Sequence, residues 1–382
     1  MKKKIICLII LITICIIPQS YAIDEESTIN EQKESFGIGT FIKNAQEYTG
    51  EFFEGLDINN ILESAISGNV DNSTFLKKVL TLFSKEFSSS IKTVFSILII
   101  IIIHSILKSI SESLENDNIS NLIYYVQYIL IATIIMSNFS DIITTVKETA
   151  TNLVGFINLL IPVLTSLMMY TGSITTSSLL EPIILFAINF IGNLIQNILI
   201  PIVLLVAALS IISKISDKVQ IDKISKMMKS GVTWTLGVIL TIFVGIVSLE
   251  GTLSSSVDGI TAKTTKAVVS SAIPVVGKIL GDSVDTVLGC GIILKNALGI
   301  VGVLIVIGIC IVPILKLGVL TICYKLTASV CETIADKKIV GLLDQIGDVF
   351  KILLAILASI SVMLIIGITL IIKISNSGMM YR

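Results

Sequence analysis

Long stretches of apolar residues recur along almost the whole chain, and they limit the folds that it can adopt. Apolar segments that cross a bilayer are expected to be helical, because every backbone amide must be hydrogen-bonded within the hydrocarbon. The candidate spans are Val94–Leu107, Leu122–Met136, Leu153–Met169, Ile183–Ile212, Val232–Leu249, Ile293–Cys323 and Ile352–Ile372. The sequence therefore predicts an all-α, polytopic membrane protein.

Composition supports this class and argues against others. Of the 382 residues, 53% are hydrophobic and 14% are charged, whereas about 25% of residues are charged in an ordinary soluble domain. The mean hydropathy is +0.95. The formal net charge is −1, and the sole arginine is Arg382. We therefore expect the lipid bilayer as the surrounding medium and no nucleic-acid partner.

The first 22 residues have the pattern of a signal peptide. Lysines at positions 2–4 precede the apolar stretch Ile5–Ile17, and Ser20-Tyr21-Ala22 forms a small-x-small cleavage site. We expect cleavage after Ala22, with an uncleaved anchor helix as the alternative. In either case the following chain begins outside the cytoplasm.

Residues 23–90 are predicted to be an acidic extracytoplasmic region. Acidic residues outnumber lysines there, and apolar residues such as Phe75, Val79 and Phe83 recur at helical spacing. Two or three amphipathic helices are expected. So short a region buries only a small core, so it should pack on the membrane part or on a partner.

Residues 91–382 are predicted to form a multi-pass membrane domain with about seven to ten passes. Ile183–Ile212 and Ile293–Cys323 are longer than one pass requires, and Pro201 and Pro313 lie near their middles, which favours two short helices joined at a break. The lysine-rich loop 213–231 belongs in the cytoplasm by the positive-inside rule. Counting from an outside N-terminus places it there only if Ile183–Ile212 crosses twice.

The prolines also suggest an internal repeat. Pro162 precedes Pro201 by 39 residues, Pro274 precedes Pro313 by the same interval, and the two pairs are offset by 112 residues. We interpret these four prolines as candidate helix breaks. Parallel repeats with broken helices are typical of transporters.

Residues suited to catalysis or metal binding are scarce. His104 is the single histidine, so neither a Ser-His-Asp triad nor a zinc site is indicated, and a packed or hydrogen-bonded role is favoured. Asp282 and Asp285, three residues apart on a helix, are more typical of a solvated face than of an aspartyl site. We expect no enzymatic activity, no cofactor and no metal.

Polar side chains within the apolar spans are candidates for a cavity lining. Asn189, Asn193 and Asn197 share one helix face, with Gln196 beside them. Lys295 and Asn296 interrupt another apolar span. These groups either line a cavity or conduit, or they join helices by hydrogen bonds, which is the favoured reading for the asparagines.

The loop 213–231 is predicted to contain a basic amphipathic helix on the inner membrane face. Setting the topology is the simpler role of its lysines, and docking of a cytoplasmic partner is the alternative. The candidate docking residues are Lys214, Lys218, Lys223, Lys226 and Lys229.

Several segments resemble the stage III sporulation protein AE family. They are Ser254–Thr261, Ile273–Gly277, Asp282–Cys290, Leu294–Gly299 and Pro313–Lys316. The order of signal sequence, acidic region and lysine-rich loop is also similar to the family. The resembling segments include Asp258, Gly259, Pro274, Gly277, Asp282, Asp285 and Gly289, which are family markers without catalytic roles.

The resemblance implies a role in endospore formation. Members of the family belong to a secretion-like complex, encoded by one operon, in the mother-cell membrane around the forespore. The complex joins a forespore partner across the intermembrane space and supports late forespore development. The implied partners are the other membrane and intermembrane-space proteins of the operon and a cytoplasmic secretion-type ATPase. A self-sufficient secondary transporter of a small solute is the alternative function.

Overall fold

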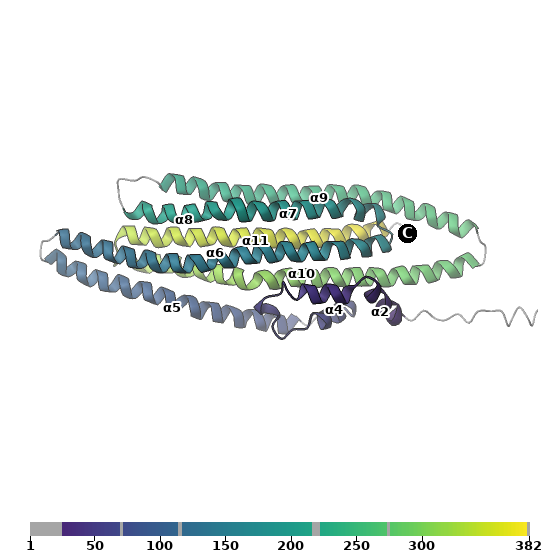
Figure 1. Ribbon diagram of the computed structural model, residues 1–382, viewed down its shortest axis with the longest axis horizontal. Helices are drawn as coiled ribbons and strands as arrows, with labels where there is room; N and C mark the ends of the chain where they lie inside the picture. The colour runs from purple at the N-terminus through teal and green to yellow at the C-terminus, as the bar shows by residue number, and fades with distance from the viewer. Residues whose placement is uncertain (1–24, 69–71, 114–116, 216–221, 273–275, 380–382) are drawn as a thin grey trace, which may run out of the picture.

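Helices make up nearly all of the part of the chain that the computed structural model describes, which comprises residues 25–68, 72–113, 117–215, 222–272 and 276–379 (Figure 1). Short helices come first: α2 (Glu25–Ser35), α3 (Ile38–Ala45), a 3₁₀ turn (Glu51–Phe53) and α4 (Ile58–Ile66). Long helices follow: α5 (Asn72–Ser113), α6 (Asp117–Tyr170), α7 (Ile174–Leu194), a π-helical turn (Ile195–Leu199), α8 (Ile200–Ile215), α9 (Asp222–Ala272), α10 (Val276–Cys331) and α11 (Lys337–Met379).

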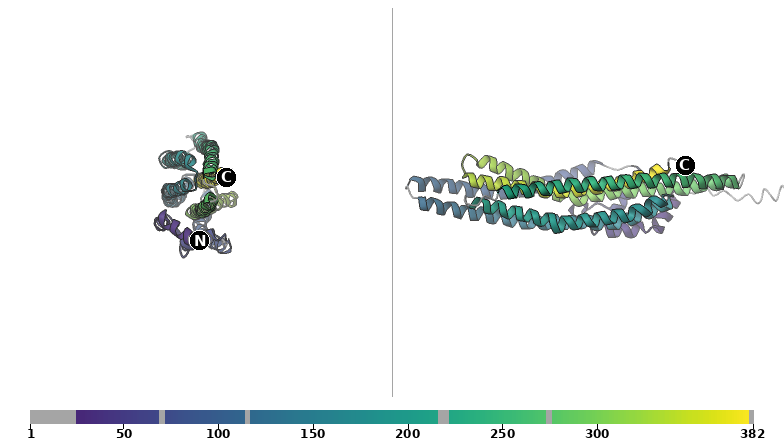
Figure 2. Two further views of the ribbon diagram at one scale, coloured as in Figure 1. Left: turned by 90° about the vertical axis from the view of Figure 1, so that its right-hand side faces the viewer. Right: turned by 90° about the horizontal axis from the view of Figure 1, so that it is seen from above.

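The long helices lie side by side in an elongated bundle (Figures 1 and 2). Helix α11 is central, since it contacts α6, α8, α9 and α10. Phe350 on α11 packs against Phe139 of α6 and Tyr324 of α10. At the end away from the α8–α9 connection, α9 and α10 extend past α6 and α11 (Figure 1).

Helices α2–α4, which we call the N-terminal module, pack along α10 and α6 (Figure 1). Phe41 lies against Phe156 of α6, and Phe53 lies over Gly308 of α10, where a Cβ atom would collide with its ring. The acidic region therefore packs on the membrane part through a small apolar core. Helix α5 runs without interruption across residue 90, the predicted limit of that region.

Six helical segments in the described residues are long and apolar enough to cross a membrane. They are Leu76–Ile110, Leu122–Tyr170, Ile174–Lys214, Asp222–Ile260, Asp285–Cys331 and Lys337–Asn376. This is fewer than the seven to ten passes predicted. The sequence prediction split Leu122–Tyr170 at its polar middle, but α6 continues there because Ile142, Val146 and Ala150 form a buried stripe at helical spacing.

The prediction that Ile183–Ile212 crosses twice is wrong. The chain passes from α7 to α8 through the π-helical turn just before Pro201. Proline has no amide hydrogen to donate, and the π turn lets the helix continue past this missing hydrogen bond. Three spans, α5, α6 and α7–α8, precede residues 216–221, so an outside N-terminus still leaves that loop on the cytoplasmic side.

The other candidate helix breaks have different outcomes. Pro162 lies inside α6 and Pro313 inside α10, and both helices continue through them, so neither residue divides its span. Neighbouring helices hold such proline-containing segments in place. Pro274 falls outside the described residues. The 112-residue repeat remains a prediction.

Candidate functional site

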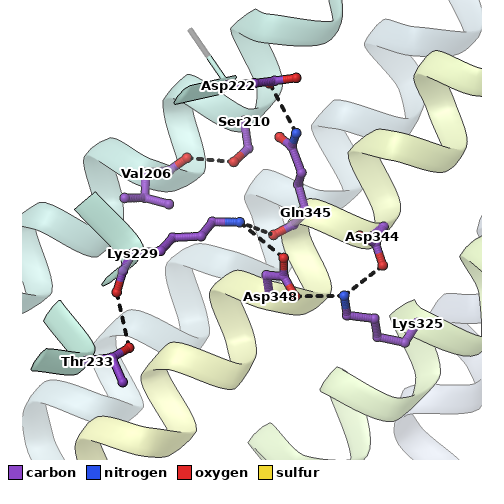
Figure 3. A network of polar contacts seen from close by, with 9 residues as sticks. All are labelled: Val206, Ser210, Asp222, Lys229, Thr233, Lys325, Asp344, Gln345 and Asp348. Atoms are coloured by element: carbon purple, nitrogen blue, oxygen red, sulfur yellow. Dashed lines mark hydrogen bonds and ion pairs between the residues drawn. The ribbon is translucent and has the colours of Figure 1, made fainter. Parts of the chain in front are cut away.

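Charged side chains join α9, α10 and α11 at the lysine-rich end of the bundle, where α8 gives way to α9 and α10 to α11 (Figure 3). Lys229 Nζ lies 3.5 Å from Asp348 Oδ2, and Lys325 Nζ lies 2.7 Å from both Asp348 Oδ1 and Asp344 Oδ1. Asp348 therefore bridges two lysines from different helices. This network links α9, α10 and α11 at that end of the bundle.

A second ion pair at the same end involves Lys214. Its Nζ lies 2.9 Å from Asp222 Oδ2, and Gln345 donates to the other carboxylate oxygen at 3.1 Å. Of the five candidate docking lysines, Lys214 and Lys229 thus bind acidic side chains of their own chain. Lys223 and Lys226 are exposed, and Lys218 lies outside the described residues. Among the described lysines, Lys223 and Lys226 are therefore the ones left open for docking, and Lys218 stays a prediction.

The turn between α10 and α11 is held to α5 through Asp336. His104 Nε2 lies 3.1 Å from Asp336 Oδ2, and Lys108 Nζ lies 2.6 Å from Oδ1. Burial by itself raises the pKa of the Asp336 carboxyl, but hydrogen bonding and the charge of Lys108, together with His104, outweigh it and leave the pKa lowered. His104 is therefore a buried, hydrogen-bonded residue.

We expect Asp336→Asn to lower the free energy of unfolding by about 1 kcal/mol at neutral pH, since the pair is partly exposed. A lowered folded pKa means that the ionised carboxylate stabilises the protein above its unfolded pKa of about 3.9. That contribution is lost as the pH falls through the folded value. The difference between wild type and variant should persist to pH 5 and close below about pH 4 in circular-dichroism melts. A gap that closes between pH 8 and 6 would contradict this assignment.

Lys295 is fully buried toward the opposite end of the bundle. Its Nζ donates to Ser375 Oγ at 2.7 Å and to Asn376 Oδ1 at 2.9 Å. Asn376 in turn donates to Asn296 at 3.1 Å. Ser375 also lies 3.0 Å from Ser173, in the turn between α6 and α7. These polar residues therefore join α10, α11 and the α6–α7 turn.

Asp258 on α9 caps the N-terminus of α7. Its two carboxylate oxygens accept hydrogen bonds from the backbone amides of Thr175 and Thr176, both at 2.9 Å. The carboxylate is buried, and it complements the positive end of the α7 dipole. Asp258 thus has a structural role that its place in the sequence motif does not reveal.

The other marker residues lie on α9, on α10 or outside the described part. Gly259 is buried on α9, while Asp285 is exposed and Gly289 half-buried on α10. Gly277 and Asp282 belong to the first turns of α10, and Pro274 is not described. The described parts of the motif segments therefore belong to helices α9 and α10.

Some of the polar side chains of α7 and its π turn form hydrogen bonds with α6. Asn189 and Asn158 exchange two hydrogen bonds of 2.9 and 3.1 Å, and Gln196 donates to Thr151 at 3.1 Å. Asn197 donates to Asn193 on the same helical path at 3.2 Å. Asn189, Asn193 and Asn197 are exposed. The structure thus gives Asn189 and Gln196 an interhelical role and places the three asparagines on the outside of the chain.

The described residues contain no group of three or more His, Cys, Asp or Glu side chains that could hold a metal ion. Sequence reasoning missed the acidic partners Asp344, Asp348 and Asp222. The one local signal for them was the spacing of Asp344 and Asp348, which places two carboxylates on one helix face just before an apolar span.

Comparisons with known proteins agree on one family. The sequence model described as "Stage III sporulation protein AE" matches residues 56–375. A curated protein named "Stage III sporulation protein AE" from Bacillus subtilis (strain 168) is 30% identical over 308 residues, which cover 81% of this chain and 77% of that protein. No solved structure matches the chain.

Proposed function

Because the chain belongs to the stage III sporulation protein AE family, we propose that it is a membrane core component of a channel-like complex between mother cell and forespore. The family assigns the chain to sporulation. Its match across residues 56–375 is the observation that carries the proposal. Six apolar spans support a multi-pass membrane location, which we place in the mother-cell membrane around the forespore.

The two ends of the bundle suit different partners. The N-terminal module, predicted to lie outside the cytoplasm, would contact intermembrane-space proteins of the same operon. Exposed Lys223 and Lys226 at the lysine-rich end would contact a cytoplasmic secretion-type ATPase. In this proposal the chain works by assembling partners and carries out no catalysis of its own.

The alternative of a self-sufficient transporter receives less support. A transporter of this kind needs a solute site between helices near mid-membrane. The space bounded by Ile157, Ile184, Phe243 and Ile368, from four different helices, has no room for a water molecule. This point of the bundle therefore offers no solute site, which favours an assembly component over a transporter with its site there.

The test is genetic. Deleting the gene in its sporulating host should abolish activity of a late forespore promoter reporter after engulfment, and expression in the mother cell alone should restore it. Expression in the forespore alone is the matched control and should not restore it. Normal reporter activity and spore yield without the gene would refute the proposal.

A further inference from the structure

A pocket opens between α5 and α6, near the end of the bundle where these two helices extend past α8 and α11 (Figures 1 and 2). We call it the hairpin pocket. Most of its wall is aliphatic and comes from helically spaced residues of both helices: Ile100, Ile103, Leu107, Ile123, Val126 and Leu130. Its volume is about 220 Å³. Since an apolar cavity of about 150 Å³ binds benzene, the hairpin pocket has room for a small molecule or part of a chain.

Two buried polar side chains also line the hairpin pocket, Gln127 of α6 and His104 of α5. Each is only 3% exposed. Within the described residues, neither amide atom of Gln127 has a hydrogen-bond partner, and the Nδ1 atom of His104 has none either. Leaving a buried donor or acceptor without a partner is costly. Because these atoms lie in the wall of a pocket, they point to a ligand that supplies the missing hydrogen bonds.

The contact between His104 and Asp336 indicates what the ligand must offer. An ionised carboxylate only accepts hydrogen bonds, so the Nε2 atom of His104 donates to Asp336, at 3.1 Å. The Nδ1 atom is then an acceptor in the neutral ring and a donor in the protonated ring. Gln127 presents both an acceptor oxygen and an NH₂ donor. A hydroxyl group both donates and accepts, so it matches Gln127 and either form of His104.

The rest of the wall requires an uncharged ligand with an apolar body. None of the described residues that line the hairpin pocket is Asp, Glu, Lys or Arg, so a charged ligand would be buried without a counter-charge. The exposed side chains of Ile103, Leu107 and Val126 border the opening. They belong to Leu76–Ile110 and Leu122–Tyr170, which are apolar enough to cross a membrane. A ligand that enters here comes from apolar surroundings.

We propose that the hairpin pocket binds an uncharged, membrane-soluble aliphatic alcohol. The aliphatic wall holds the chain of the ligand, and Gln127 and His104 bind its hydroxyl group. This site goes beyond the proposed function and does not depend on it. Because His104 also contacts Asp336, one imidazole ring connects the bound hydroxyl to the turn between α10 and α11.

Photolabelling of the full-length chain in phosphatidylcholine nanodiscs tests the site. The probe is octanol carrying a diazirine, and mass spectrometry locates the labelled residues. We expect label at residues such as Ile103 and Val126. At equal concentration in the membrane, 1-octanol should suppress this label at least about tenfold more effectively than n-octane, which lacks the hydroxyl. Label that is absent from the hairpin pocket, or that octane suppresses equally well there, overturns the proposal.

The groove between α7 and α9 is an internal control for this experiment. Its described lining, which includes Phe186 and Ile242, is entirely apolar. Octanol and octane should therefore suppress any label in this groove to the same extent. The same octanol preference in both places would show that the preference does not come from Gln127 and His104, and would overturn the proposal.

Gln127→Leu distinguishes a ligand site from a direct hydrogen bond between the two helices. The substitution keeps a similar volume and removes both unpaired amide atoms, so the delipidated variant should melt at the same temperature as wild type or higher. Its preference for octanol over octane should fall to near onefold. Gln196→Leu, which removes an amide bonded to Thr151, should leave the preference unchanged. A Gln127→Leu variant that melts lower, or that keeps the octanol preference, overturns the proposal.

Discussion

Replacing Asp258 with alanine should lower the free energy of unfolding by about 2–4 kcal/mol. The change removes a buried carboxylate that accepts two backbone hydrogen bonds at the start of α7. Hydrogen bonds to charged groups contribute about 1.5–3 kcal/mol, and buried donors without an acceptor are costly. Thermal unfolding in detergent can be followed with a thiol-reactive dye, because Cys290, Cys310, Cys323 and Cys331 are buried in the folded chain.

Two control variants make the Asp258 prediction specific. Asp258→Asn keeps one acceptor oxygen and should lose about half as much stability. Thr252→Ala, on an exposed position of the same helix, should stay within about 0.5 kcal/mol of wild type. An Asp258→Ala chain as stable as Thr252→Ala would show that the α7 N-terminus does not depend on this cap.

The sequence predicted the type of fold well and the number of passes poorly. Hydropathy identifies apolar stretches, but the polar segment between Met136 and Leu153 reads as a loop by composition. It is helical because Ile142, Val146 and Ala150 are buried by other helices, and such contacts are not local. Proline was likewise overestimated as a helix breaker, since tertiary packing carries the helices through Pro162 and Pro313.

For the candidate site, too, the sequence predicted the local features and missed the long-range contacts. Helical periodicity predicted that Asn189, Asn193 and Asn197 share a face, because spacing on one helix is a local property. Which way that face points depends on where α6 packs. The partners of Lys229 and Lys295 are 119 and 80 residues away along the chain. Pairs at such separations leave no pattern in a single sequence.

Two substitutions of Lys295 can distinguish a purely structural role of this residue from a role of its amine in function. Lys295→Ala should cost about 3–5 kcal/mol, because it leaves a cavity and removes the donor to Ser375 and Asn376. Lys295→Met keeps most of the volume, and replacing a buried charge with an apolar side chain of similar size is often close to neutral. The thiol-dye assay should therefore show strong destabilisation for alanine and a much smaller effect for methionine.

The forespore reporter then decides what the amine does. If Lys295 only joins α10 to α11 and the α6–α7 turn, Lys295→Met should retain reporter activity in proportion to its stability. A methionine variant as stable as wild type but without reporter activity would contradict the structural role. It would mean that the amine of Lys295 is needed for function and not only for joining these helices.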